Sequence, residues 1–225
     1  MMNIYEEQYQ LLKQNGAQAW AGEGYKRAHQ QLTVILQELK QRSILPSPGA
    51  SFLELGCGNG AMSSQYMAEH GYEVSGVDIS QTAIEWAIER LLTLGLKGNF
   101  TQGDVCHLKQ LEADSYDVIF DGSCLHCLIG SQRELCLTEI RRLIKPEGTV
   151  VISTMAGKPK KPEDLRDFDA DNYHLIRNGQ PWRTLKPLTL LEEEISNQGF
   201  SIIYTDLNHN PWWDHATICC KPSQE

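Results

Sequence analysis

Residues 51–60 read SFLELGCGNG, an apolar run that carries one carboxylate, Glu54, and ends in a glycine-rich turn. A short apolar run bounded by turn residues is typical of a buried strand. Glycines let the chain turn tightly and let a ligand approach the main chain, and Gly56-x-Gly58 also satisfies a dinucleotide fingerprint. Asp78 ends the next apolar run and suits a ribose hydroxyl. These residues predict an adenosine-type cofactor without identifying it.

Apolar segments alternate with helical patterns along the rest of the chain. We expect strands at residues 51–56, 73–78, 99–103, 116–121, 149–155, 200–206 and 216–220. We expect helices at residues 24–42, 61–70 and 80–94, a short one near 107–111, and two more that begin at 131 and 189. This alternation requires right-handed crossovers and produces a parallel sheet. The nine residues 207–215 between the last two strands are too few for a crossover helix, so this pair should be antiparallel.

Local signals set the expected boundaries. Ser131-x-x-Glu134 and Thr189-x-x-Glu192 read as capping boxes that begin the last two helices. Residues 156–187 are rich in proline and in charges of both signs and lack clear periodicity, so we expect an insertion there. The chain then divides into an N-terminal helical segment or lid, residues 1–48, and a main domain, residues 49–225.

Composition limits the function. With 20 Lys+Arg against 29 Asp+Glu, the 225-residue chain has a net charge of -9, which disfavours nucleic acid or an anionic membrane surface as a partner. Seven scattered cysteines, an odd number, are typical of reduced thiols in the cytoplasm. No apolar run approaches the ~18 residues that a membrane span requires. We therefore expect a cytoplasmic protein that binds a small-molecule substrate.

The charge of Glu54 bears on the identity of the cofactor. A carboxylate just before the glycine turn opposes a pyrophosphate at the helix N-terminus and favours a ligand that carries an ammonium and a sulfonium. A dehydrogenase also usually needs a separate substrate-binding region, whereas one doubly wound unit takes up nearly everything after residue 50. A nicotinamide-dependent oxidoreductase remains the alternative.

Four motifs fall in order at the expected strand ends. They are residues 54–60, Asp78, residues 103–105 (Gly-Asp-Val), and residues 116–121 followed by Leu125-His126. With them, the chain resembles a class I S-adenosylmethionine-dependent methyltransferase over roughly residues 52–221. A further match, RLIKPEG at residues 142–148, has glutamate where glycine is commoner. The resemblance implies an α/β, doubly wound, Rossmann-like sheet of seven strands. Their order would be 3-2-1-4-5-7-6, with strand 7 antiparallel and helices on both faces.

The resemblance also implies a cofactor, S-adenosylmethionine, and a reaction in which an acceptor O, N or S displaces its methyl group in line and releases S-adenosylhomocysteine. Glu54 would face the methionyl ammonium, Asp78 would bind the ribose, and Asp104 with the Val105 amide would hold adenine. The full set of implied cofactor contacts is Glu54, Gly56, Cys57, Gly58, Gly60, Asp78, Ile79, Gly103, Asp104, Val105 and Asp121.

The acceptor should lie beyond the carboxyl ends of the parallel strands, where ligands bind in open α/β sheets. The loop 122–130, the insertion, the turn 208–215 and the N-terminal segment should meet there. The expected substrate pocket comprises Tyr25, His126, His209, Trp212 and Trp213. Alternatively, the two tryptophans pack against the sheet edge. The aromatic residues of the N-terminal segment could form a lid over the ligands or belong to the core: Tyr5, Tyr9, Trp20 and Tyr25.

His126 is the main candidate for a general base because imidazole titrates near neutral pH, and Asp121 is a second candidate. Alternatively, no base is used and His126 only shapes the pocket. The sequence Cys124-Leu125-His126-Cys127 lacks a second spaced pair of ligands, so we expect no metal.

The basic residues of the insertion could pair with an acidic acceptor, although interleaved acids favour a solvated, self-paired loop. These residues are Lys158, Lys160, Lys161, Arg166, Arg177 and Arg183. A nucleobase amino-methyltransferase is disfavoured because DGSC at residues 121–124 replaces the Pro-Pro-aromatic motif of that family. A protein that binds S-adenosylmethionine without turnover is the remaining alternative.

Overall fold

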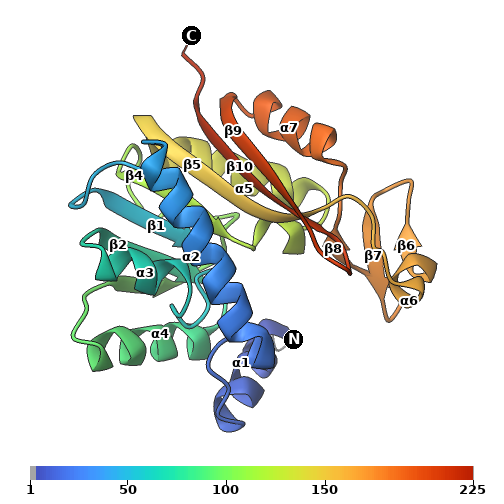
Figure 1. The fold of residues 1–225 in the computed structure, drawn as a ribbon, viewed down its shortest axis with the longest axis horizontal. Helices are drawn as coiled ribbons and strands as arrows, with labels where there is room; N and C mark the ends of the chain where they lie inside the picture. Colours follow the sequence, from blue (N-terminus) through green and yellow to red (C-terminus); the bar gives the residue numbers. More distant parts are fainter. Residues whose placement is uncertain (1–3, 225) are drawn as a thin grey trace.

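A computed structural model describes residues 4–224, and its centre is a seven-stranded sheet in the order β3-β2-β1-β4-β5-β10-β9 (Figure 1). The strands are β1 (Ser51–Leu55), β2 (Glu73–Asp78), β3 (Asn99–Gln102), β4 (Tyr116–Gly122), β5 (Ile144–Ala156), β9 (Phe200–His209) and β10 (Asp214–Pro222). Strands β3, β2, β1, β4 and β5 run parallel to one another, and β10 is antiparallel to both of its neighbours, β5 and β9. The expected α/β fold and strand order are confirmed.

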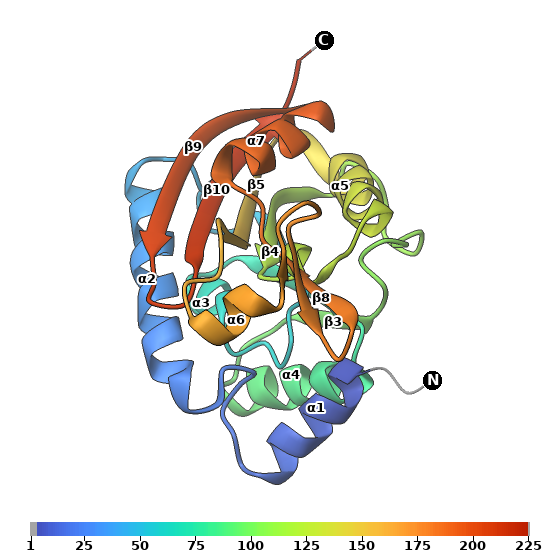
Figure 2. The same cartoon turned by 90° about the vertical axis from the view of Figure 1, so that its right-hand side faces the viewer.

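Helices cover both faces of this sheet (Figure 2). They are α1 (Ile4–Gln14), α2 (Tyr25–Gln41), α3 (Ser63–Glu69), α4 (Gln81–Thr93), α5 (Ser131–Leu143), α6 (Pro162–Arg166) and α7 (Leu188–Asn197), with 3-10 turns η1 (Gly22–Gly24) and η2 (Leu125–Cys127). Leu36 of α2 and Met67 of α3 pack with Phe52 on one face. Leu137 of α5 and Leu191 of α7 pack on the other face. Each face thus buries the apolar side of its amphipathic helices.

The connections from β1 place its carboxyl end at the point where the strand order reverses. The chain leaves β1 toward β2 on one side, whereas β4 lies on its other side. Leu55 pairs with Asp121, so β1 and β4 end nearly level. A crevice outside such a switch point is the usual ligand site of an open α/β sheet.

The short helix expected near residues 107–111 does not form, and the chain makes turns there. Its backbone groups bond to side chains of α5 instead. Arg142 donates to the carbonyl oxygens of Leu108 and Leu111 at 2.9 Å each, and Glu139 accepts from the Leu108 N–H at 2.9 Å. These bonds take the place of a helical ladder.

Both expected capping boxes are wrong. Helix α5 has Gly130 as its N-cap and α7 has Pro187, so Ser131 and Thr189 lie inside the first turn and cap nothing. The closing hairpin is longer than expected, because β9 continues to His209 and β10 begins at Asp214. Its loop therefore has four residues, 210–213.

The insertion, residues 156–187, contains α6 and a three-stranded antiparallel sheet rather than an unstructured loop. Its strands are β6 (Phe168–Asp169), β7 (His174–Arg177) and β8 (Gln180–Thr184). They have a small core of their own around Leu175 and Leu185, which contacts Met155 of β5. Figure 2 shows this unit in front of the sheet edge, above α1.

The N-terminal segment lies beside α4 at the same edge (Figure 2). Helix α1 is followed by η1 and then by α2, which crosses the sheet. The expected N-terminal segment, residues 1–48, includes residues 1–3, and the expected main domain, residues 49–225, includes residue 225. Residues 1–3 and residue 225 lie outside the described part of the chain. Within residues 4–224, no helix is both long and apolar enough to cross a bilayer.

Candidate active site

A cavity of about 590 Å³ opens at the carboxyl ends of β1, β2, β3 and β4. The loops after these strands form its floor, and α1, α2, the insertion and the β9–β10 hairpin form its walls. Twelve of the expected site residues line it: Glu54, Gly56, Cys57, Gly58, Asp78, Ile79, Gly103, Asp104, Val105, His126, Trp212 and Trp213. The switch point of the sheet therefore carries a cavity that most of the expected site residues line.

The glycine turn after β1 requires glycine for both conformation and space. Gly56 and Gly58 have φ of 66° and 53°, in the left-handed region. A Cβ at Gly56 would lie 2.7 Å from the Cβ of Cys124, and one at Gly58 would collide with the Tyr9 hydroxyl. Any side chain at either position would displace Cys124 or Tyr9, so the turn packs closely against both of these residues.

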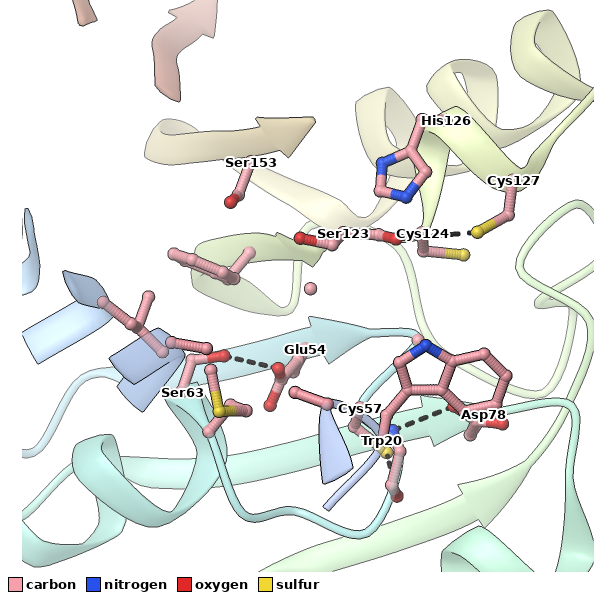
Figure 3. Close-up of a pocket in the computed structure, with 18 of the residues that line it drawn as sticks. Trp20, Glu54, Cys57, Ser63, Asp78, Ser123, Cys124, His126, Cys127 and Ser153 are labelled. Atoms are coloured by element: carbon pink, nitrogen blue, oxygen red, sulfur yellow. Dashed lines mark hydrogen bonds between the residues drawn. The ribbon is translucent and has the colours of Figure 1, made fainter. Parts of the chain in front are cut away.

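Glu54 projects from β1 into the cavity and is 2 % exposed (Figure 3). The hydroxyl of Ser63 donates to one carboxylate oxygen, and the N–H of Ser64 donates to the other at 2.9 Å. Burial raises the pKa of Glu54 to about 7, although these hydrogen bonds act in the opposite direction. A cation beside it would favour the ionised form.

Asp78 holds the glycine turn in place from the end of β2 (Figure 3). Its Oδ2 accepts from the Gly58 N–H at 2.9 Å, and its Oδ1 accepts from the Ser80 N–H at 2.9 Å. Burial raises the pKa of Asp78 above its usual value. One buried carboxylate thus links the first two loops, and it still lines the cavity.

Asp104 and Val105 extend the same wall from the loop after β3. Asp104 Oδ1 accepts from the Cys106 N–H at 2.9 Å. Burial acts to raise the pKa of Asp104, but hydrogen bonds from Cys106 and His107 outweigh it and lower the pKa. With Glu54 and Asp78, this end of the cavity carries three carboxylates.

His126 lies on η2 at the opposite wall (Figure 3). Its Nδ1 accepts from the Met155 N–H at 3.3 Å, so in the neutral ring the proton is on Nε2. Burial, together with the positive charge of Arg183, lowers the pKa of His126 well below its usual value. This arrangement favours a neutral ring that donates a hydrogen bond over a general base.

Asp121 does not reach the cavity, although we expected it as a cofactor contact and as a possible base. Its Oδ1 accepts from the N–H groups of Cys124 at 2.8 Å and Leu125 at 2.9 Å. Its Oδ2 is buried and has no hydrogen-bond partner among the described residues. Burial raises the pKa of Asp121 to about 7. Asp121 thus holds the turn that presents His126.

Three further expected residues lie elsewhere. Tyr25 donates to the Ala61 carbonyl at 3.2 Å and lines a separate shallow pocket beside Trp86. His209 is exposed, and its Nδ1 lies 2.8 Å from Asp214 Oδ1. Gly60 packs toward Ala87 of α4. None of the three lines the large cavity.

Aromatic residues from the N-terminal segment border the cavity. Tyr5, Tyr9 and Trp20 line it, and Trp20 packs against both tyrosines with ring centroids 5.8 and 5.1 Å apart. Glu6 anchors the segment through bonds from Ser80 Oγ at 2.7 Å and the Thr82 N–H at 3.2 Å. Tyr5, Tyr9 and Trp20 thus border the cavity, whereas α2 of the same segment packs in the core of the sheet.

Ser63 and Ser153 line the cavity but carried no recognisable signal in the sequence, whereas Arg183 was one of several basic candidates in the insertion. Ser63 holds Glu54, and Ser153 contacts His215 Nε2 at 2.9 Å across β5 and β10. Arg183 lines the cavity from β8 and is 7 % exposed. Serines are common at helix starts and in strands, so only the three-dimensional arrangement identifies these. Within residues 4–224, no group of three or more His, Cys, Asp or Glu side chains is arranged to hold a metal ion.

Comparisons of this chain with family models and with known proteins all match methyltransferases. A sequence model described as a methyltransferase domain matches residues 46–210, about three quarters of the chain. Phosphoethanolamine N-methyltransferase 1 of Arabidopsis thaliana is 27% identical over 168 residues, which cover 72% of this chain and 33% of that protein. Ubiquinone biosynthesis O-methyltransferase of Nitrosospira multiformis is 33% identical over 113 residues, or 50% of this chain and 46% of that protein. The chain spans between about a third and a half of these relatives.

A solved structure shares the fold. It is 1,6-didemethyltoxoflavin-N1-methyltransferase of Burkholderia thailandensis, with bound 1,6-didemethyltoxoflavin and S-adenosylhomocysteine. The TM-score is 0.68 at 20% sequence identity, over 88% of this chain and 79% of that one. At this identity the likeness establishes the architecture alone.

Proposed function

This chain belongs to the class I S-adenosylmethionine-dependent methyltransferase family, and we propose that it methylates a small-molecule acceptor. The observation that carries the proposal is the pair of buried carboxylates, Glu54 and Asp78, on either side of a glycine turn at the switch point of the sheet. A pyrophosphate there would face negative charge at short range, whereas a sulfonium and an ammonium would be attracted. The relatives named above act on small molecules, which supports the same substrate class.

The residues present fit S-adenosylmethionine. Glu54, in β1 just before the turn, would accept from the methionyl ammonium, and arrival of that cation would ionise a carboxyl whose pKa is about 7. Asp78 would bind the ribose hydroxyls, and Asp104 with Val105 would border the adenine. Gly56 and Gly58, which line the cavity, would border the carboxypropyl arm.

The cofactor supplies a methyl group activated by the positive sulfur, and in-line attack by the acceptor leaves S-adenosylhomocysteine. The protein then contributes mainly alignment and exclusion of water. Tyr9, Trp20, Trp212 and Trp213 line the cavity; in this proposal the first two would cover the cofactor and the two adjacent tryptophans would border the acceptor. His126, neutral and buried, would orient the acceptor by donating from Nε2.

Turnover with labelled S-adenosylmethionine tests this proposal. The panel of acceptors contains alcohols, phenols, amines, thiols, carboxylates and phosphate esters, and formation of S-adenosylhomocysteine is measured for each. We expect release that depends on one acceptor class. Tight binding without release for any acceptor would support a non-catalytic binding protein instead. Hydride transfer with a nicotinamide cofactor would support the oxidoreductase alternative.

A further inference from the structure

Charge is distributed unevenly around the cavity. Its three carboxylates, Glu54, Asp78 and Asp104, belong to the loops after β1, β2 and β3. Arg183 of β8 is the one arginine or lysine that lines the cavity in the described part of the chain. The proposed cofactor site explains the acidic side, and nothing in that proposal uses the arginine.

Arg183 is buried without a counter-ion. Its Nη1 donates to the Trp182 carbonyl at 2.8 Å and to the Tyr5 hydroxyl at 3.1 Å. No ion pair involves Arg183 within residues 4–224, and its Nε and Nη2 atoms donate to no acceptor there. A buried guanidinium is costly unless it is paired.

Arg133, the other buried arginine, shows how this fold treats a guanidinium that has only a structural role. Its Nε and Nη2 donate to the two carboxylate oxygens of Glu194 at 2.8 and 2.7 Å, and its Nη1 donates to the Leu125 carbonyl at 2.7 Å. Every edge of that group is satisfied. Arg183, in contrast, has Nε and Nη2 available to hydrogen-bond a ligand in the cavity.

The position of Arg183 is fixed by its surroundings. The guanidinium stacks on the Trp182 ring at 3.8 Å from the centroid, and the Tyr5 ring lies 5.9 Å away. Thr184, the next residue, donates to the Leu128 carbonyl at 2.9 Å, which ties β8 to the loop that carries His126. A pre-oriented fork of this kind suits bidentate recognition of a carboxylate or phosphate.

We propose that Arg183 is a specificity-determining residue that binds an anionic group, a carboxylate or a phosphate, on the methyl acceptor. This inference rests on the proposed function and narrows its substrate class. The cationic cofactor then occupies the acidic side of the cavity and the anionic group of the acceptor faces the opposite wall. The two ligands are sorted by charge, so neither competes for the other's position.

Anion binding to the protein saturated with S-adenosylhomocysteine tests the inference. Sodium phosphate and sodium acetate are titrated separately at constant ionic strength, and calorimetry measures each dissociation constant. The Arg183→Gln variant should bind the preferred anion roughly 10- to 100-fold more weakly, the loss expected when hydrogen bonds to a charged group are removed. Preference for phosphate or for acetate in the wild type identifies the source of the anionic group.

Arg177→Gln is the matched control. Arg177 also stacks on the Trp182 ring, at 4.8 Å, but it is exposed and does not line the cavity. The Arg177→Gln variant removes one positive charge from the same small sheet as Arg183→Gln does, and its anion affinity should change less than about twofold. Equal losses in both variants, or no binding of either anion to the wild type, would overturn the inference.

A folding defect is distinguished by a second variant and by cofactor affinity. Arg183→Lys keeps the charge and loses the fork, so it should recover part of the anion affinity while binding S-adenosylhomocysteine as the wild type does. Unchanged anion affinity in both folded Arg183 variants would refute the assignment. Failure of the wild type to bind S-adenosylhomocysteine would refute the proposed function itself, and the inference with it.

Discussion

At the scale of single residues, Asp78 has two duties. It holds the glycine turn through the N–H groups of Gly58 and Ser80, and its carboxylate also faces the cavity. Replacement by alanine removes both loop bonds together with the proposed ribose contact. A loss of ligand affinity alone would therefore be ambiguous, and a control of similar structural cost is needed.

Asp78→Ala should weaken binding of S-adenosylhomocysteine by roughly tenfold or more, since hydrogen bonds to a carboxylate are lost. Asp117→Ala is the control. Asp117 sits at the amino end of β4, where it accepts from the Ser51 N–H at 2.8 Å and pairs with Lys145 at 2.8 Å. Calorimetry and thermal melting should show destabilisation in both variants and weaker binding in Asp78→Ala alone. Unchanged affinity in Asp78→Ala would mean that the ribose lies elsewhere.

Asp121 gives a prediction about pH. Burial raises its pKa to about 7 in the folded protein, so between the unfolded value near ~4 and pH 7 the folded state holds more protons than the unfolded state. Stability must then fall as the pH rises through this window. Asp121→Asn keeps an oxygen acceptor for Cys124 and Leu125 and removes the titration.

Thermal melting at pH 5 and pH 7 without ligand checks this expectation. The wild type should lose more stability between the two pH values than Asp121→Asn does, because Asp121 titrates only in the wild type. The variant should still lose some stability, because Glu54, whose pKa is about 7, titrates in both proteins. Glu134→Gln, on the exposed side of α5, serves as the control for a change of one surface charge. An identical loss in wild type and Asp121→Asn would contradict the raised pKa.

Asp121 also shows where sequence reasoning fails for single residues. Spacing after the first two strands was enough to find Glu54 and Asp78. Asp121 lies near the end of β4 in the same way, but it is the register partner of Leu55, which belongs to the core beneath α5 and α7. Partners in a parallel pair point to the same face, so this carboxylate points away from the cavity. Register between strands cannot be read from spacing along one strand.

At the scale of elements, α1 is held over the cavity by Glu6. Ser80 and Thr82, at the start of α4, donate to this carboxylate. Burial acts to raise the pKa of Glu6, but these hydrogen bonds outweigh it and lower the pKa to about 2. The ionised form is therefore favoured in the docked lid, and this contribution is present above the unfolded pKa near ~4.3 and is lost as the pH falls toward 2.

Glu6→Gln should loosen α1 without unfolding the sheet. Hydrogen exchange in residues 4–14 should speed up, and S-adenosylhomocysteine should dissociate several-fold faster, because the lid covers the cofactor end. Glu7→Gln is the control, since Glu7 is the adjacent exposed residue. If both variants exchange and dissociate like the wild type, Glu6 does not anchor the lid.

The sequence predicted elements best where a pattern was long. All seven strands of the main sheet and its helices α2 to α5 and α7 were expected, because their periodicity extends over several turns or a full strand. The strands of the insertion are two to five residues long, too short to show a period. The short helix near residues 107–111 failed because Arg142, far along the chain, takes its carbonyl oxygens.

At the scale of the whole molecule, the cavity is assembled from segments that lie far apart in the sequence. Its floor comes from the ends of β1 to β4, one wall from α1 and α2, and its opposite wall from the insertion and the hairpin. The sequence could place the floor, because parallel strands end at one edge. It could not choose Arg183 among the seven Lys and Arg residues of the insertion, since only the packing of β8 decides which side chain is buried.

The central claim is that this cavity binds a positively charged nucleoside without phosphate groups. Calorimetry with S-adenosylmethionine and with NADH, on the same preparation of the full chain, tests it most directly. We predict one S-adenosylmethionine per chain, with affinity that rises from pH 6 to pH 8 as Glu54 ionises, and no heat from NADH. Binding of NADH in the absence of binding by S-adenosylmethionine would contradict the account.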